Sequence, residues 1–156
     1  MNIKKKLISL RIIAIAVAIS LIMPGYAIAT ENDDVSPRAS YYLDSYNTYA
    51  YNAALGKIQI YFDVTGVHYM DELGTLSIKI FESTDKESWT WVETYTNGDT
   101  PSMLGYDDVY YSGHVDYLGT IGRYYKAYVC IWAGKDGQGD TRYMWTNVVK
   151  ASLFPG

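Results

Sequence analysis

The chain has 156 residues, 49% hydrophobic and 19% charged, which is the composition of a globular protein that can bury a core. Its formal net charge is −4, and setting aside the four basic residues of the first 29 positions leaves nine basic against 17 acidic side chains, or −8. This balance argues against a nucleic-acid partner, because affinity for phosphates depends mainly on Lys and Arg. The single Cys excludes an internal disulfide framework and any multi-cysteine metal site.

The first 29 residues have the three parts of a secretory signal peptide. Lys4–Lys6 supply the positive charge. Ile12–Met23 form an apolar run of roughly 18 Å of helix, shorter than the roughly 30 Å core of a membrane. Ala27 and Ala29 place small residues where signal peptidase reads them, so we expect cleavage between Ala29 and Thr30. The mature protein is then secreted and extracellular, with no permanent membrane span.

Residues 30–39 are polar, acidic and contain Pro37, which indicates a flexible N-terminal arm. We assign residues 40–156 to a single domain. In it, short stretches rich in Ile, Val, Tyr, Trp and Thr alternate with Gly, Asn and Asp, and helical periodicity is absent. Seven strands are predicted, at 44–52, 57–65, 75–83, 89–96, 110–118, 123–132 and 142–150. The fold class is therefore all-β, and the pattern fits a single seven-stranded sandwich of the immunoglobulin or fibronectin type III kind.

The segment 123–132 predicts which side chains face the core. Ala127, Val129 and Ile131 are small or aliphatic at alternate positions, so the residues between them face outward. Tyr125 stands two residues before Ala127, in a pattern that resembles the tyrosine corner of immunoglobulin-like domains. The Cys pair of those domains is absent, which leaves the subclass of sandwich open.

The turn Ser83–Trp89 resembles the Asp-box hairpin of sialidase and other propeller repeats, whose pattern is Ser-x-Asp-x-Gly-x-Thr-Trp. Here the loop is one residue shorter, Glu87 stands near the usual Gly, and the pattern occurs once, whereas a propeller repeats it. We therefore expect a structural turn, in which Asp85 caps the backbone and Trp89 covers it.

The signal, the segment Glu31–Leu43, the turn Glu82–Asp85 and the strand Gly122–Gly134 together resemble a family of small secreted proteins of Gram-positive bacteria. The resemblance covers nearly the whole mature chain and implies export. That family has no assigned activity, so the resemblance adds nothing about mechanism.

Residues with catalytic chemistry do not form a recognisable constellation in the sequence. His68, in a predicted loop, and His114, in mid-strand, are the only histidines. A nucleophile elbow, a His-Glu-x-x-His helix and a glycine-rich phosphate loop are all missing from the sequence. We expect no enzyme and assign no catalytic residue, no metal site and no cofactor, although distant Asp and Glu residues can still assemble a glycosidase site.

Two further features near the C-terminus have a functional and a structural interpretation. Gly134–Asp140 has the oxygen ligands and glycines of a calcium loop but lacks the bidentate Glu of an EF-hand, so we favour a hairpin joining two strands. Cys130 is either unpaired or intermolecular, and its parity places it off the core. We expect an inert, partly covered thiol.

The 17 Tyr residues are the unusual part of the composition, beside four Trp and three Phe. Two adjacent residues of a strand point to opposite sides of the sheet, so one Tyr of each adjacent pair must face away from the core. Immunoglobulin-like topology makes the strands 75–83 and 123–132 neighbours, with the last strand alongside. One outer sheet face is then an aromatic platform, and its candidate ligand-binding residues are Tyr124, Tyr128, Trp132, Phe81, Tyr143 and Trp145. The alternative is that these rings only cover the sheet.

The sequence therefore predicts a secreted, non-catalytic binding module that contacts a carbohydrate or a cell surface through an aromatic sheet face. The alternative is a self-associating or protein-binding extracellular component, in which the same face is an interface.

Overall fold

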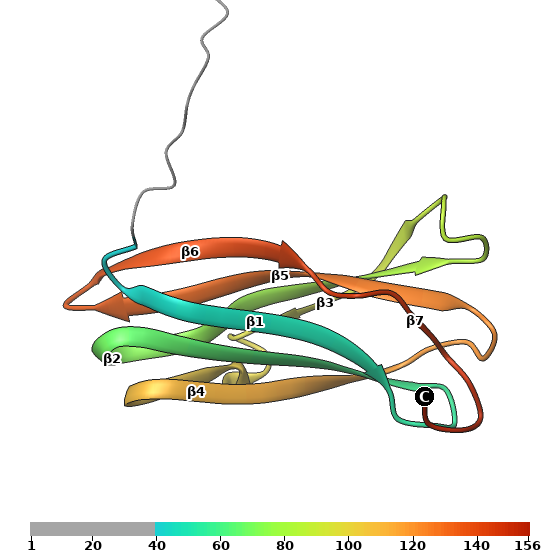
Figure 1. Ribbon diagram of the computed structural model, residues 1–156, viewed down its shortest axis with the longest axis horizontal. Coiled ribbons are helices and arrows are strands. Elements are labelled where there is room, and N and C mark those ends of the chain that lie inside the picture. The colour runs from blue at the N-terminus through green and yellow to red at the C-terminus, as the bar shows by residue number, and fades with distance from the viewer. Residues whose placement is uncertain (1–39) are drawn as a thin grey trace, which may run out of the picture. The chain divides into compact units, whose positions relative to one another are not determined.

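The computed structural model describes residues 40–156, which belong to one compact unit (Figure 1). The predicted signal peptide, the cleavage site between Ala29 and Thr30 and the arm 30–39 lie outside the described residues. The all-β prediction is confirmed: the described residues form seven strands and one 3-10 turn, η1 (Pro101–Met103). The strands are β1 (Leu43–Asn52), β2 (Lys57–Ser83), β3 (Thr90–Thr96), β4 (Leu104–Leu118), β5 (Tyr124–Lys135), β6 (Gln138–Trp145) and β7 (Val149–Lys150). Among these residues, no helix is long and apolar enough to cross a membrane.

The seven strands form one antiparallel sheet, curled into a half-barrel, and the predicted division into a two-sheet sandwich is not confirmed. The reason is β2, in which the two strands predicted at 57–65 and 75–83 are continuous. Its first part pairs with β1 and β4, and its last part pairs with β3 and β5. Both halves of the curled sheet therefore share one strand.

The bend in β2 replaces the predicted loop between those two strands. The pairs Thr65–Tyr110 and Met70–Asp108 are separated by five residues on β2 and by only two on β4. The extra residues of β2 therefore bulge out of the ladder. Gly74 ends this region with φ +145°, and a Cβ there would lie 2.2 Å from the carbonyl oxygen of Met103. Only glycine fits that conformation and that close backbone contact.

The core lies between the two halves of the curled sheet. Alternate residues of the first part of β2, among them Ile60 and Phe62, meet Ile78 and Ile80 of its last part and the odd-numbered side of β5. Each such side chain contributes roughly 1.5–3 kcal/mol by leaving water. On β5 the predicted alternation is confirmed, since Ala127, Val129 and Ile131 are fully buried. In the strand predicted at 75–83, alternation places Leu76 inside with Ile78 and Ile80. Leu76 is instead half-buried, because the register shifts between Thr75 and Ser77 and turns Thr75 inward.

The last predicted strand, 142–150, is divided into β6 and β7. Thr146 interrupts it with a buried hydroxyl that accepts a hydrogen bond from the Ala127 N–H at 2.9 Å. The next residue, Asn147, turns its amide towards β1, where it accepts from the Ala50 N–H and donates to the Ala50 carbonyl, at 2.8 and 3.0 Å. Asn147 thus joins the two edges of the half-barrel by a side chain where strand pairing is missing.

A second side-chain link lies at the other end of β1 and β6. Asp140 accepts hydrogen bonds from the Ser40 hydroxyl at 2.5 Å and from the Tyr41 N–H at 3.0 Å. These hydrogen bonds lower the pKa of Asp140, and the one from Ser40 has the largest effect. The beginning of the described domain is therefore held to the β6 edge.

Tyr125 makes the contact expected of a tyrosine corner. It is fully buried, and its hydroxyl accepts a hydrogen bond from the Thr120 N–H at 2.7 Å, five residues upstream, and donates one to Glu82. Arg123 donates to the other oxygen of Glu82 at 2.9 Å. The local motif is therefore present although the sheet is not divided as in an immunoglobulin sandwich.

The two turns singled out in the sequence have structural roles. Asp85 accepts hydrogen bonds from the Ser88 and Glu87 N–H groups, which lower its pKa, and Trp89 donates to the Lys86 carbonyl at 3.0 Å. The segment from Gly134 to Asp140 is the β5–β6 hairpin, in which Asp136 and Gly137 have φ of 52° and 73°. Positive φ at both positions is the geometry of a type I′ turn.

Candidate binding surface

The predicted aromatic residues lie on the side of β2, β5 and β6 that faces away from the core. In an antiparallel pair, residues opposite each other carry their side chains on the same side. Tyr128 is opposite Trp145 of β6 and Lys79 of β2, and Cys130 is opposite Tyr143. Because the residues that alternate with these are buried, this side is the outer one. The predicted order β2–β5–β6 is confirmed.

Four of the six candidate residues form one continuous group. The Tyr128 ring lies 4.8 Å from Trp145 and 5.6 Å from Tyr143, measured between centroids, and is nearly parallel to Tyr143 at 16°. Phe81 lies 5.2 Å from Trp145. Trp145 and Tyr143 remain exposed by 47% and 59%. We call the surface made by Phe81, Tyr128, Tyr143 and Trp145, with Trp89 and Trp91, the outer aromatic face.

Trp89 and Trp91 were not among the predicted binding residues. Trp91 is opposite Phe81 in the β2–β3 register and is 61% exposed. Trp89 belongs to the neighbouring turn, and the Lys126 ammonium lies 4.3 Å from its ring centroid and 4.4 Å from that of Trp145. The spacing Trp-x-Trp indicates that both rings lie on the same side of the chain. It does not indicate that Phe81 lies on that side too.

Tyr124 lies on the same side as Tyr128, at the end of the outer aromatic face. Its ring is in cation–π contact with two ammonium groups, from Lys86 at 4.5 Å and Lys150 at 5.5 Å. Lys150 is opposite Tyr124 in the β5–β7 pair. The ring of Tyr124 therefore holds positive charge beside the outer aromatic face.

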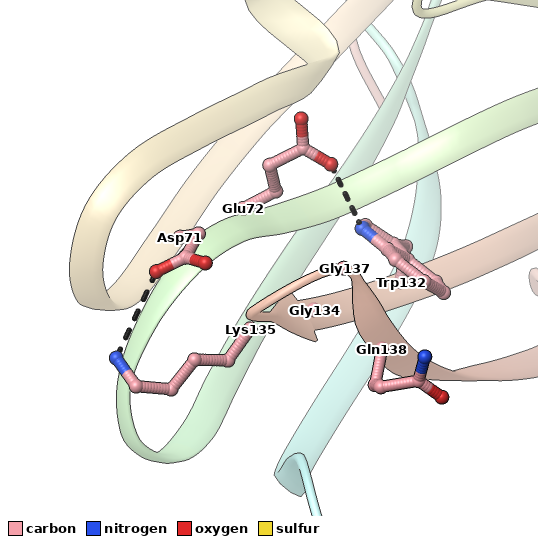
Figure 2. A pocket seen from close by; sticks show the side chains of 7 residues that line it. All are labelled: Asp71, Glu72, Trp132, Gly134, Lys135, Gly137 and Gln138. Carbon is pink, nitrogen blue, oxygen red and sulfur yellow. Dashed lines mark hydrogen bonds and ion pairs between the residues drawn. The ribbon is translucent and has the colours of Figure 1, made fainter.

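Trp132 lies apart from the other candidates, at the hairpin end of β5. Figure 2 shows it beside Glu72, to which its indole N–H donates a hydrogen bond at 3.3 Å. A Cβ added to Gly134 or Gly139 would lie 2.5 or 2.4 Å from its ring, so the indole covers the backbone of both glycines. This packing gives Trp132 a structural role that sequence reasoning missed.

Trp132 also lines an open pocket of about 220 Å³ with Asp71, Glu72 and Lys135 (Figure 2). The three charged side chains of this pocket are already engaged with other groups of the protein. Asp71 accepts a hydrogen bond from the Asp136 N–H at 2.6 Å and lies 3.7 Å from the Lys135 ammonium. These carboxylates stabilise the hairpin.

The remaining predicted features are separated from one another. His68 is exposed in the bulge of β2, rather than in a loop between strands, and lines an open pocket with Tyr42. His114 lies on β4 against Tyr61, at 5.0 Å between centroids. Cys130 is only 5% exposed, so it is covered more completely than predicted, and burial raises the pKa of its thiol.

A second aromatic group lies on the outer side of β1, β2 and β4. Tyr49 stacks on Tyr61 at 4.9 Å and 8°. Its polar neighbours bond to one another, since Asp116 accepts hydrogen bonds from Gln59 at 2.9 Å and from Lys57 at 3.1 Å. This group therefore offers a ligand fewer free polar partners than the outer aromatic face does.

Comparison with known proteins adds no relative: the chain matches no family model, no curated protein and no solved structure.

Proposed function

We propose that the protein is a secreted, non-catalytic binding module that takes a carbohydrate on the outer aromatic face. The observation that carries the proposal is the continuity of Phe81, Tyr128, Tyr143 and Trp145 across three adjacent strands, with Tyr143 and Trp145 about half exposed. Rings held by a sheet bury large apolar area with little loss of rotamer entropy.

The shape of this surface favours a flat ligand. The rings stand on paired strands, and three pockets of the described residues lie elsewhere, two at the β5–β6 hairpin and one beside the C-terminal segment. A sugar ring has an apolar side that can stack on Tyr or Trp and hydroxyl groups at its rim. Lys79 and Lys126 on the same side supply hydrogen-bond donors for such a rim.

Binding of the exported protein to immobilised polysaccharides tests the proposal, with Trp145→Ala as the variant and Tyr49→Ala as its control. Both side chains are nearly half exposed, at 47% and 44%, and both stack on neighbours, but Tyr49 lies on the other half of the sheet. We expect Trp145→Ala to weaken binding about tenfold, which corresponds to about 1.4 kcal/mol, and Tyr49→Ala to bind normally.

Two results contradict the proposal. Equal binding by Trp145→Ala and the parent protein places the ligand elsewhere. Absence of glycan binding, together with a concentration-dependent dimer in light scattering that Trp145→Ala abolishes, assigns the outer aromatic face to protein association instead.

A further inference from the structure

Four lysines of the described residues have no acidic partner. Residues 40–156 contain six lysines, of which Lys57 pairs with Asp116 at 3.1 Å and Lys135 with Asp71 at 3.7 Å. The other four have no carboxylate of the described residues within 4.0 Å, and they are Lys79, Lys86, Lys126 and Lys150. In a chain with more acidic than basic residues, this separation is a local excess of positive charge.

All four of these lysines lie on the side of the outer aromatic face. Lys79 is opposite Tyr128, Lys126 is opposite Phe81 and Lys150 is opposite Tyr124 in the strand registers. Lys86 reaches the same side from the Asp85 turn, where its ammonium lies over Tyr124. None of the side chains that point to this side from 77–81 of β2 and 126–130 of β5 is acidic.

The four ammonium groups lie at successive positions along the outer side of β5. Lys86 and Lys150 lie at Tyr124, and Lys126 is the next residue on that side. Lys79 is opposite Tyr128, which is the residue after that on the same side. Two residues of a strand span about 7 Å, so positive charge recurs at that interval along the aromatic rings. A row of charges beside a row of rings suits a linear ligand with repeated negative charges better than it suits a single small anion.

We propose that the ligand of the outer aromatic face is an acidic polysaccharide, whose sugar rings stack on Tyr128 and Trp145 and whose carboxylates pair with these four lysines. The inference rests on the proposed function and names its substrate class. A single-stranded nucleic acid also combines rings with negative charge. The export predicted from the first 29 residues favours a polysaccharide, because uronate polymers occur outside cells.

Polygalacturonate and its methyl-esterified form provide a matched pair of probes, because esterification keeps the sugar chain and removes the charge. We expect the exported protein to bind the acid form at least tenfold more tightly, and this preference to shrink between 50 and 300 mM salt as the charges are screened. Hyaluronate and alginate, tested beside it, cover uronates in other linkages.

The double variant Lys79→Gln, Lys150→Gln should bind the acid polymer about tenfold more weakly and with a flatter salt dependence. Lys57→Gln is the control, because Lys57 is paired with Asp116 on the other half of the sheet, and it should bind normally. Circular dichroism confirms that each variant is folded.

Three results overturn the inference. In the first, the acid and esterified polymers bind equally well, and Trp145→Ala still abolishes the binding of both. This result contradicts the preference for acidic polymers and leaves the proposed function intact. Binding to none of the three uronates, with binding to a neutral glycan, does the same. Tighter binding to single-stranded DNA than to any uronate replaces the polysaccharide by a nucleic acid.

Discussion

Replacing Ile131 or its neighbour Trp132 by Ala tests the two sides of β5. Ile131 is fully buried among core residues, so its truncation removes apolar contacts and leaves a cavity, at a cost of about 2–5 kcal/mol in the free energy of unfolding. Trp132 is half-buried, and truncating it opens the site to solvent rather than leaving a sealed cavity. Its ring does cover Gly134 and Gly139, so its loss should cost about 1–2 kcal/mol.

Urea unfolding of the protein and both variants, followed by far-UV circular dichroism, measures these costs without depending on Trp fluorescence. Equal slopes against urea concentration allow the midpoints to be compared as free energies. If Trp132→Ala destabilises the protein as much as Ile131→Ala, the assignment of the two sides of β5 is refuted. A loss below about 1 kcal/mol in Ile131→Ala refutes the position of the core.

Thr75→Val should stabilise the protein by about 1–2 kcal/mol in urea unfolding, because the buried Thr75 hydroxyl has no hydrogen-bond partner among the described residues. Thr48→Val should instead destabilise it by about 1 kcal/mol, because that hydroxyl donates to a carbonyl at 2.7 Å; the same sign in both variants contradicts this reasoning. Burial, and then the hydrogen bond to Glu82, raises the pKa of Tyr125 to about 12. This neutral hydroxyl stabilises the fold fully below pH 10, and the contribution is lost as the pH rises to about 12, so alkaline unfolding should be steep in that window and flatter in Tyr125→Phe. Mass spectrometry of the exported protein should find Thr30 as its first residue, and a retained Met1 in a membrane fraction would contradict the signal assignment.

The strands could be predicted where alternation is a local property, and this was true of Lys57–Thr65 and of β5. The region from Gly66 to Gly74 could not, because glycine marks both a loop and a strand that bends against another backbone. Gly74 belongs to the second case, since its φ is +145° and it lies against Met103. The division after Trp145 was also hidden, because it depends on partners 19 and 97 residues away in the sequence.

The candidate surface was predictable in its centre and not at its borders. Phe81, Tyr128, Tyr143 and Trp145 follow from the parity of three strands and the order of those strands. Trp91 joins them only because β3 pairs with β2 in one particular register, which no local pattern specifies. Four lysines have no acidic partner among residues 40–156, and this could not be predicted because it depends on where the carboxylates of the folded sheet lie.

The length of β2 has a consequence for how the protein opens. Because β2 (Lys57–Ser83) contributes backbone hydrogen bonds to β1 and β4 in one half of the sheet and to β3 and β5 in the other, neither half can lose β2 without disturbing the other. The protein should therefore lack a stable subunit of folding smaller than the whole sheet. In hydrogen exchange, the amides on both sides of the bend should share one free energy of opening, that of global unfolding. The amides of the β6 edge should have a lower free energy of opening, because they exchange through local fraying.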